Sequence, residues 1–245
     1  MPDFSPVVTD FWAAAFSGKQ LHHNDYLTIT VNPDLAGDSS VTVLRTTDDE
    51  HVSIAVHPVV ADGLTKDIAS LRNPTETDIR AAFANRGVAL KGPDHVFYLT
   101  EAAAQDILAA AEPANVRQLT DADAEICASF KAVAPEDDWD GAYAELDHWA
   151  AFGVFDERGT LAGIGSMYPW DDELPLADVG VLTLSSARGR GHAKTLVREM
   201  FRYALTLGFE PQYRCQLDNR PSIRLAAGLG LQLFGQWEVA MPDEK

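Results

Sequence analysis

The residues best suited to chemistry lie where an apolar segment runs into a loop that holds two glycines and two arginines. Ala177–Leu184 is rich in β-branched and apolar residues, which predicts a strand. The loop Arg188-Gly-Arg-Gly-His-Ala193 follows, and apolar residues at three- and four-residue spacing then predict a helix that stops at Gly208. A strand–loop–helix unit points backbone N–H groups and a helix dipole at one spot, so the pattern predicts an anion site for phosphate or pyrophosphate.

The glycines and arginines of this loop each suit an anion for a separate reason. Gly189 and Gly191 tolerate positive φ and have no Cβ to hold a phosphate away from the backbone. Arg188 and Arg190 keep their charge at any physiological pH. The same residues also fit an ordinary strand-to-helix turn with two exposed arginines, because short glycine motifs have many false positives. The spacing fits neither a Walker A loop nor G-x-G-x-x-G.

The loop resembles a family signature. Arg188, Gly191 and Ala193 match the R/Q-x-x-G-x-G/A acetyl-CoA signature of the GNAT acyltransferase superfamily, in the same strand–loop–helix context. Downstream, Asn219-x-x-Ser222-x-x-Leu225 followed by Gly230-Leu231 resembles the closing helix of that superfamily. The resemblance covers residues 114–241. Together with Pro211-Gln-Tyr-Arg214, it is similar to a bacterial GNAT subfamily that has an extra N-terminal region.

The resemblance implies an α/β (α+β) fold with a mixed, mostly antiparallel central sheet. Helices would flank this sheet, and one pair of parallel strands would splay apart. The chain would divide into an N-terminal auxiliary αβ domain, residues 1–112, and a GNAT domain, residues 113–245. The first domain could be a degenerate GNAT-like half. The periodicity predicts helices at 8–17, 64–71, 75–83, 101–111, 120–131, 143–149 and 193–205, the one near 143–149 being opened by Asp137–Asp140. It predicts strands at 26–31, 41–45, 52–56, 96–99, 116–119, 151–155, 161–167, 178–184, 213–217 and 231–240.

Composition narrows the classes of partner. The chain has 245 residues and a net charge of −18, from 37 acidic and 19 basic residues, which disfavours nucleic acid. This charge is compatible with a cationic acceptor, and it also fits simple solubility. No apolar run is long enough for a membrane span, and the first residues lack a signal-peptide pattern, so we expect a cytoplasmic protein. Cys127 and Cys215 are expected to be reduced.

The resemblance also implies a set of residues that bind acetyl-CoA as a co-substrate. Backbone groups of Leu182 and Leu184 on the central strand would bind the pantetheine. Asn219 and Ser222 would contact the pantetheine or adenine end, and Asn219 would also cap its helix. The pyrophosphate would be held by the amides of the loop, namely Arg188, Gly189, Arg190, Gly191, His192 and Ala193.

Direct attack of an amine on the thioester needs a proton acceptor and a proton for the leaving thiolate. Asp178 is the candidate base, and the alternative is a strand-end aspartate exposed to water. Many family members place a tyrosine after the leucine of the closing helix as the acid, but here that position is Ala226. Tyr213 and Tyr168 are possible substitutes. Further carboxylates that could bind a cationic amine are Asp137, Asp138 and Asp140.

These features predict an acyl-CoA-dependent N-acyltransferase that transfers acetyl from acetyl-CoA to a small primary amine or an amino-terminal group. One alternative is a GNAT-fold protein that binds CoA with little or no catalysis, since Ala226 replaces the usual acid. The other is a structural or partner-binding protein without a CoA site. The histidines are scattered and no metal-ligand spacing occurs, so we predict no metal. The chain is expected to be a monomer or a homodimer, with neither nucleic acid nor membrane as a partner.

Overall fold

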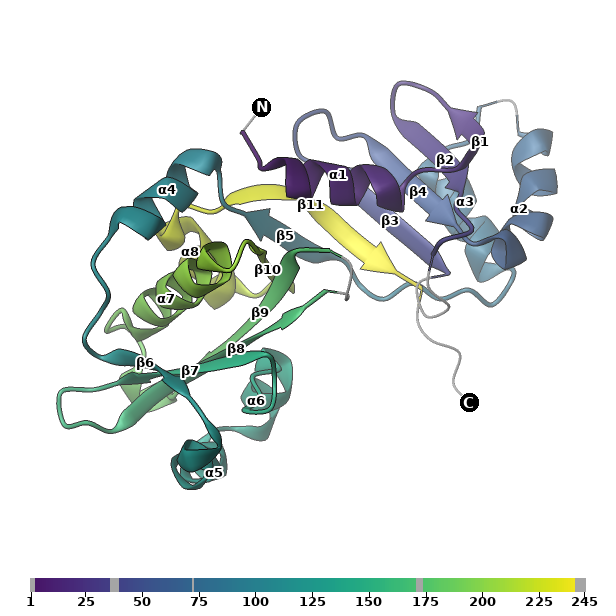
Figure 1. The fold of residues 1–245 in the computed structure, drawn as a ribbon. Helices are drawn as coiled ribbons and strands as arrows, with labels where there is room; N and C mark the ends of the chain where they lie inside the picture. The colour runs from purple at the N-terminus through teal and green to yellow at the C-terminus, as the bar shows by residue number, and fades with distance from the viewer. Residues whose placement is uncertain (1–2, 36–39, 72, 171–173, 241–245) are drawn as a thin grey trace.

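A single sheet runs through the whole molecule in the computed structural model, which describes residues 3–35, 40–71, 73–170 and 174–240. Its eleven strands follow the order β1-β2-β4-β3-β11-β5-β10-β9-β8-β7-β6 (Figure 1). The strands are β1 (Lys19–His23), β2 (Leu27–Val31), β3 (Val41–Thr46), β4 (Val52–Val56), β5 (Asp94–Tyr98), β6 (Val116–Leu119), β7 (Ala150–Phe155), β8 (Leu161–Pro169), β9 (Leu176–Thr183), β10 (Glu210–Gln216) and β11 (Gln232–Val239).

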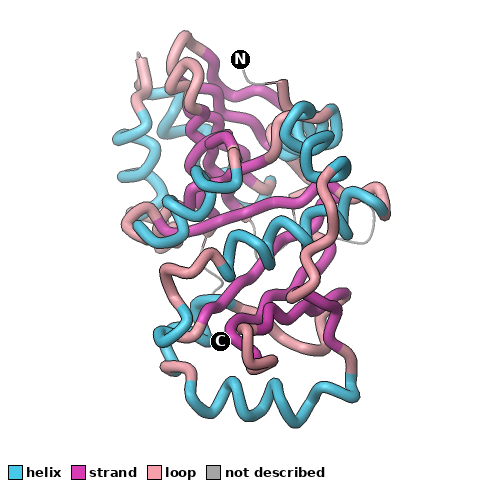
Figure 2. The backbone as a smooth tube through the Cα atoms, turned by 90° about the vertical axis from the view of Figure 1, so that its left-hand side faces the viewer, coloured by secondary structure: helices cyan, strands magenta, loops and turns pink. Residues whose placement is uncertain are grey.

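Helices cover this sheet along its length (Figure 2). They are α1 (Pro6–Ala15), α2 (Pro58–Ser70), α3 (Glu76–Ala84), α4 (Glu101–Ala109), α5 (Ala124–Val133), α6 (Glu136–Ala142), α7 (His192–Thr206) and α8 (Arg220–Leu229), with short 3-10 turns at Asp121–Asp123 and Ser185–Ala187. The expected mixed, mostly antiparallel sheet flanked by helices is confirmed. None of these helices, over the described residues, is both long and apolar enough to cross a membrane.

Two parallel neighbours, β9 and β10, separate partway along their length. They pair only over residues 176–178 and 210–212. Beyond that point β9 pairs with β8 alone, while residues 213–216 of β10 pair antiparallel with β5. The two strands therefore leave unpaired backbone on both sides of a wedge, which is the splayed arrangement that the resemblance implies.

Strand β5 comes from the N-terminal half of the chain and lies between β10 and β11 of the C-terminal half. It pairs with β10 through residues 94–97 and with β11 through residues 94–98. β11 continues the sheet into the N-terminal half by pairing antiparallel with β3 (Figure 1). The division at residue 112 stays a prediction, and the backbone hydrogen bonds of one sheet join the two halves.

The core around the wedge is built on both faces of the sheet because successive strand residues alternate in direction. On one face, Val179 packs with the apolar stripe of α7, which includes Met200 and Phe201. On the other face, Leu182 packs with Phe130 of α5 and Trp139 of α6. The wedge is therefore held between α7 on one side and α5 and α6 on the other.

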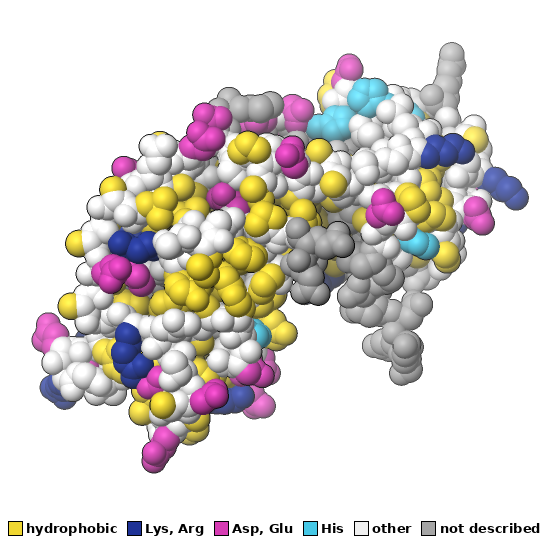
Figure 3. Space-filling view, in the orientation of Figure 1, with side chains coloured by type: hydrophobic (Ala, Val, Ile, Leu, Met, Phe, Trp, Pro, Cys, Tyr) yellow, Lys and Arg dark blue, Asp and Glu magenta, His cyan; other side chains and the backbone are white. Residues whose placement is uncertain are grey.

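The elements differ from the predicted ones at three main places, the first being α2, which begins at Pro58 and not at residue 64. The helix predicted to open at Asp137–Asp140 is present as α6, but its predicted extent over 143–149 is wrong, because the helix ends at Ala142 and Tyr143 adopts the left-handed conformation with φ 46°. Strand β1 was not predicted, since its polar sequence Lys-Gln-Leu-His-His carries no strand pattern and lies at the sheet edge. Asp and Glu side chains are spread over both halves of the face seen in Figure 3, in keeping with the acidic composition.

Candidate active site

A cleft of about 400 Å³ opens where β9 and β10 separate. Both halves of the chain contribute to its walls. The lining residues are Lys91, Asp94, Asp140, Gly141, Ala142, Tyr143, Tyr168, Asp178, Val179, Gly180, Val181, Tyr213, Arg214, Cys215, Gln216, Asn219 and Ser222. Asp178, Tyr213, Asn219 and Ser222, all predicted from the sequence, meet in this one cavity.

The backbone groups of β9 that face the wedge belong to odd-numbered residues. Leu184 donates its N–H to the Ala162 carbonyl, and the register of β9 with β8 continues without a bulge. Hydrogen-bonded pairs alternate along an antiparallel ladder, so the backbone of Leu182 also points toward β8. The prediction that Leu182 and Leu184 offer their backbone to a pantetheine is therefore wrong. Val179, Val181 and Thr183 present theirs to the wedge instead.

The loop before α7 presents a row of free donors. Among the residues that the structure describes, no acceptor takes the backbone N–H groups of residues 189–194. Gly189 and Gly191 have φ of 76° and 84°, and a Cβ at either position would meet open space. These amides, at the positive end of a 15-residue helix, fit a pyrophosphate. His192 and Ala193 form the first turn of α7 and contribute N–H groups to the row.

The two arginine side chains of the loop lie differently from each other. Arg188 forms an ion pair with Asp138 at 2.7 Å and donates from Nε to the Thr183 carbonyl at 3.2 Å. It therefore ties the loop to α6. The side chain of Arg190 is exposed, and Arg190 is itself one of the residues whose backbone N–H is free. Of the three predicted acceptor-wall carboxylates, Asp140 lines the cleft and Asp138 is held by Arg188.

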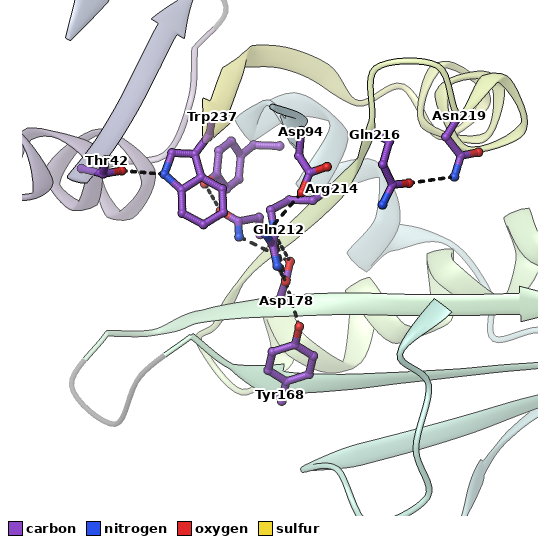
Figure 4. A network of polar contacts seen from close by, with 10 residues as sticks. Thr42, Asp94, Tyr168, Asp178, Gln212, Arg214, Gln216, Asn219 and Trp237 are labelled. Carbon is purple, nitrogen blue, oxygen red and sulfur yellow. Dashed lines mark hydrogen bonds and ion pairs between the residues drawn. The ribbon is translucent and has the colours of Figure 1, made fainter. Parts of the chain in front are cut away.

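Asp178 lies at the narrow end of the cleft and is the centre of a buried polar network (Figure 4). Its side chain accepts hydrogen bonds from Tyr168 at 3.0 Å, from Gln212 at 3.3 Å and from Arg214 Nε at 3.0 and 3.2 Å. The Nη2 group of Arg214 donates to it as well. With 3% of its surface exposed, Asp178 is not the water-exposed aspartate of the alternative interpretation. Both its oxygens are engaged, which suits an anchor better than a proton acceptor.

The guanidinium of Arg214 lies against two indole rings that also contact each other, with centroids 5.3 Å apart. Its Cζ lies 5.0 Å from the ring centroid of Trp170 and 5.1 Å from that of Trp237, distances at which a cation is attracted to an aromatic face. Its Nη1 lies 3.7 Å from a carboxylate oxygen of Asp94. Arg214 thus joins β10 and β9 to an aromatic cluster in which Trp170 contacts Phe11 and Trp237 contacts Trp12 of α1.

Gln212 extends the network away from the cleft. It is fully buried, and its Oε1 accepts from Tyr98, whose hydroxyl accepts from Trp12 Nε1 at 3.0 Å. Burial raises the pKa of Tyr98 well above its usual range, so this hydroxyl stays protonated and can donate. Each polar side chain in this series of hydrogen bonds, from Trp12 of α1 to Asp178, has a partner, as a buried polar network requires.

Tyr213 faces the closing helix α8 from the neighbouring strand. Its ring is buried, with 2% exposed, and its hydroxyl interacts with Ser222. Burial raises the pKa of Tyr213 to about 12, against a smaller lowering by Ser222. Ala226 lies one helical turn further along and is fully buried in the apolar core. Position 226 therefore supplies no acid, and Tyr213 brings a protonated hydroxyl to the same helix.

Asn219 caps α8 as the sequence predicts. Its side-chain oxygen accepts the Ser222 N–H at 3.1 Å, and its Nδ2 lies 3.4 Å from Gln216 Oε1 (Figure 4). The helix ends at Gly230, where φ is 79°. The cap uses the oxygen of Asn219 and places Ser222 against the cleft.

Gly180 makes room for residues 142–143, which line one side of the cleft. A Cβ at Gly180 would overlap the Ala142 carbonyl oxygen and lie 2.8 Å from that of Tyr143. That crossing places the ring of Tyr143 beside Tyr168 and His148, with centroids 5.4 and 4.9 Å away.

We expect Gly180→Ala to lower the free energy of unfolding by about 1–3 kcal/mol, because the overlap is with backbone that must shift. Urea unfolding measures this loss. Gly228→Ala is the matched control, since that helical glycine has open space and should gain up to about 1 kcal/mol. Equal stability of the two variants would contradict the close packing of residues 142–143 on β9.

Sequence reasoning did not select Asp94, Gln212 or Arg214 as site residues. Gln212 and Arg214 lie two residues apart on the strand after α7, so their side chains share one face of that strand. A search for polar residues on one strand face could have found them. Asp94 lies more than a hundred residues earlier in the chain, and no local signal joins it to the cleft. Within the described ranges, no three His, Cys, Asp or Glu side chains are grouped so that they could hold a metal ion.

Comparison with known proteins bears on the C-terminal half. Residues 114–231 match the family model described as the acetyltransferase (GNAT) family. Nothing among the curated proteins matches the chain. A GNAT-family acetyltransferase from Colwellia psychrerythraea is similar in fold, with 17% identity and a TM-score of 0.50 over 82% of this chain and 81% of that one.

Two further solved structures align over smaller shares. A GNAT-family protein from Novosphingobium aromaticivorans has 18% identity and a TM-score of 0.42, over 64% of this chain and 66%, just under two thirds, of that one. An aminoglycoside N-acetyltransferase solved in complex with CoA has 22% identity and a TM-score of 0.39, over 49% of this chain and 92% of that one.

Proposed function

We propose that the chain transfers acetyl from acetyl-CoA to a primary amine, and the match of residues 114–231 to the acetyltransferase (GNAT) family model supports this proposal. One observation carries the proposal: the free amides of residues 189–194 lie at the end of the strand that borders the wedge. In this proposal the loop holds the pyrophosphate and the odd-numbered backbone of β9 holds the pantetheine. Holding the amine in position against the thioester then supplies much of the rate enhancement.

The departing thiolate needs a proton, and Tyr213 is the group that we assign to supply it. Its pKa, raised to about 12, keeps the hydroxyl protonated at neutral pH. We expect Tyr213→Phe to lower kcat about 100-fold, a typical loss for a missing general acid, with unchanged affinity for CoA. Steady-state kinetics and equilibrium binding measure the two quantities separately.

Two further tyrosine variants make this prediction specific. Tyr203→Phe is the control, because Tyr203 packs on Trp149 and Phe152 outside the cleft, and it should keep full activity. If Tyr213→Phe keeps its activity while Tyr168→Phe loses it, the acid is Tyr168 and our assignment is wrong.

The proposed activity is tested by following acetyl transfer to butylamine, putrescine, lysine and a short peptide with a free amino terminus. Mass spectrometry detects the acetylated product, and a thiol reagent detects released CoA. We expect at least one acceptor to give both products. Ala226, which replaces the usual acid, favours a second candidate, a CoA-binding protein without catalysis. Tight CoA binding with no acetylated product from any acceptor would support this second candidate.

A further inference from the structure

The N-terminal half supplies one carboxylate to the cleft. Asp94 begins the inserted strand β5, where it pairs with Gln216 of β10 and Trp237 of β11. Side chains of directly paired residues lie on the same face of a sheet, so Asp94 faces the same side as Gln216 and Arg214. It lines the same cavity as Tyr168 and Asp178.

Asp94 and Asp178 lie on either side of Arg214, but their environments differ. Asp178 accepts hydrogen bonds from Tyr168, Gln212 and Arg214. Asp94 has one ion pair with Arg214 at 3.7 Å, and over the described part of the chain no donor hydrogen-bonds its carboxylate. Its side chain is 13% exposed. Its oxygens are therefore free to accept a proton or a hydrogen bond from a molecule in the cleft.

The charges around Asp94 leave it a better proton acceptor than an ordinary surface carboxylate. Burial raises its pKa, and the nearby charge of Asp178 raises it further. Arg214, Lys91 and His95 act in the opposite direction, and the net pKa is still raised. These groups lie on β10, on β9, on its own strand and in the segment before it, and His95 is the one that points to the opposite face of the sheet. A carboxylate whose pKa approaches the working pH is more effective as a base.

We propose that Asp94, supplied by the N-terminal half, binds the amino group of the acceptor and takes its proton, while the Arg214–Asp178 pair holds the wall in place. This role rests on the proposed acetyl transfer. An N–H bond of the ammonium group breaks and an O–H bond forms on Asp94. The freed lone pair forms a C–N bond to the thioester carbonyl carbon, the C–S bond breaks, and the departing thiolate takes the proton of Tyr213. The second proton that the nitrogen loses as the amide forms restores the Tyr213 hydroxyl through solvent. The step needs no oxidant or reductant. The acceptor class is a primary amine that is protonated in solution at neutral pH.

The test compares Asp94→Asn and Asp94→Glu with the matched control Asp10→Asn, which removes an exposed carboxylate from α1 of the same half. We expect Asp94→Asn to lower kcat/KM for the amine about 100-fold, with the dissociation constant of acetyl-CoA unchanged. Asp94→Glu should recover part of the activity. Asp10→Asn should match the wild type in both measurements.

The pH profile separates a chemical role from a structural one. In the wild type, kcat/KM for the amine should fall on the acid side as Asp94 becomes protonated, and this limb should be absent in Asp94→Asn. Wild-type activity in Asp94→Asn would overturn the assignment and leave the proposed function standing. Loss of acetyl-CoA binding in that variant would also overturn it, as a structural effect. No transfer by the wild type to any amine of the panel would instead contradict the proposed function, and this role with it.

Discussion

Replacing Gly191 by valine is expected to weaken acetyl-CoA binding by at least about 1000-fold, because the loss of three hydrogen bonds to a charged group at about 1.5 kcal/mol each removes about 4.5 kcal/mol. Gly191 precedes α7 with φ of 84°, a conformation that a β-branched residue strongly disfavours. A valine would turn the backbone and place its side chain in the space where the phosphate is expected. Equilibrium dialysis with labelled acetyl-CoA measures the change.

A second valine variant separates ligand binding from backbone strain. Gly159 in the β7–β8 turn has φ of 76° and open space around it, so Gly159→Val imposes similar strain far from the loop. We expect this control to lose stability and keep its affinity for acetyl-CoA. If both variants bind equally well, the anion site at the start of α7 is wrong.

Removing Arg214 should destabilise the fold more than any other single change in the cleft. Arg214→Met leaves the carboxylate of Asp178, only 5% exposed, without its cation, and breaking one side of a buried ion pair costs about 3–5 kcal/mol. The aromatic contacts to Trp170 and Trp237 are lost with it. Urea unfolding of the wild type and the variant gives the difference in free energy.

The double variant Arg214→Met/Asp178→Asn distinguishes the buried charge from lost packing. With no charge left unpaired, it should be more stable than Arg214→Met alone, because the two changes are coupled. Arg224→Met, at an exposed position of α8, should change the stability by no more than about 0.5 kcal/mol. A double variant as unstable as the sum of the two single changes would show that the ion pair contributes little.

Local patterns predicted the elements that hold the anion site. The apolar strand, the glycines and the strongly amphipathic helix stand next to one another in the sequence, and the structure has β9 and α7 in that order. The sequence could not show which backbone groups of β9 point toward the wedge. Knowing which side chains share a face does not reveal which N–H groups are free of a neighbouring strand. The Leu184–Ala162 hydrogen bond decides this, and it turns the backbone of Val179, Val181 and Thr183 toward the wedge, where the Thr183 carbonyl accepts from Arg188.

The parts that could not be predicted depend on contacts between distant segments. Nothing around Asp94 indicates that β5 inserts between β10 and β11, since strand pairing across the sheet is a tertiary property. The predicted helix at 143–149 is absent because α6 ends at Ala142, where Ala142 and Tyr143 pack closely on Gly180 of β9. The role of Asp178 changed for a similar reason, as its partners Tyr168, Gln212 and Arg214 come from two other strands.

The most direct measurement is a calorimetric titration of the wild-type protein with acetyl-CoA and, separately, with desulfo-CoA. The account predicts binding of both with a dissociation constant on the order of micromolar, since the pyrophosphate and pantetheine contacts do not depend on the sulfur. Absence of binding at about millimolar ligand, in a protein that unfolds cooperatively, would contradict it. The wedge between β9 and β10 would then be a feature of the fold without a ligand, and acetyl transfer would have to be abandoned.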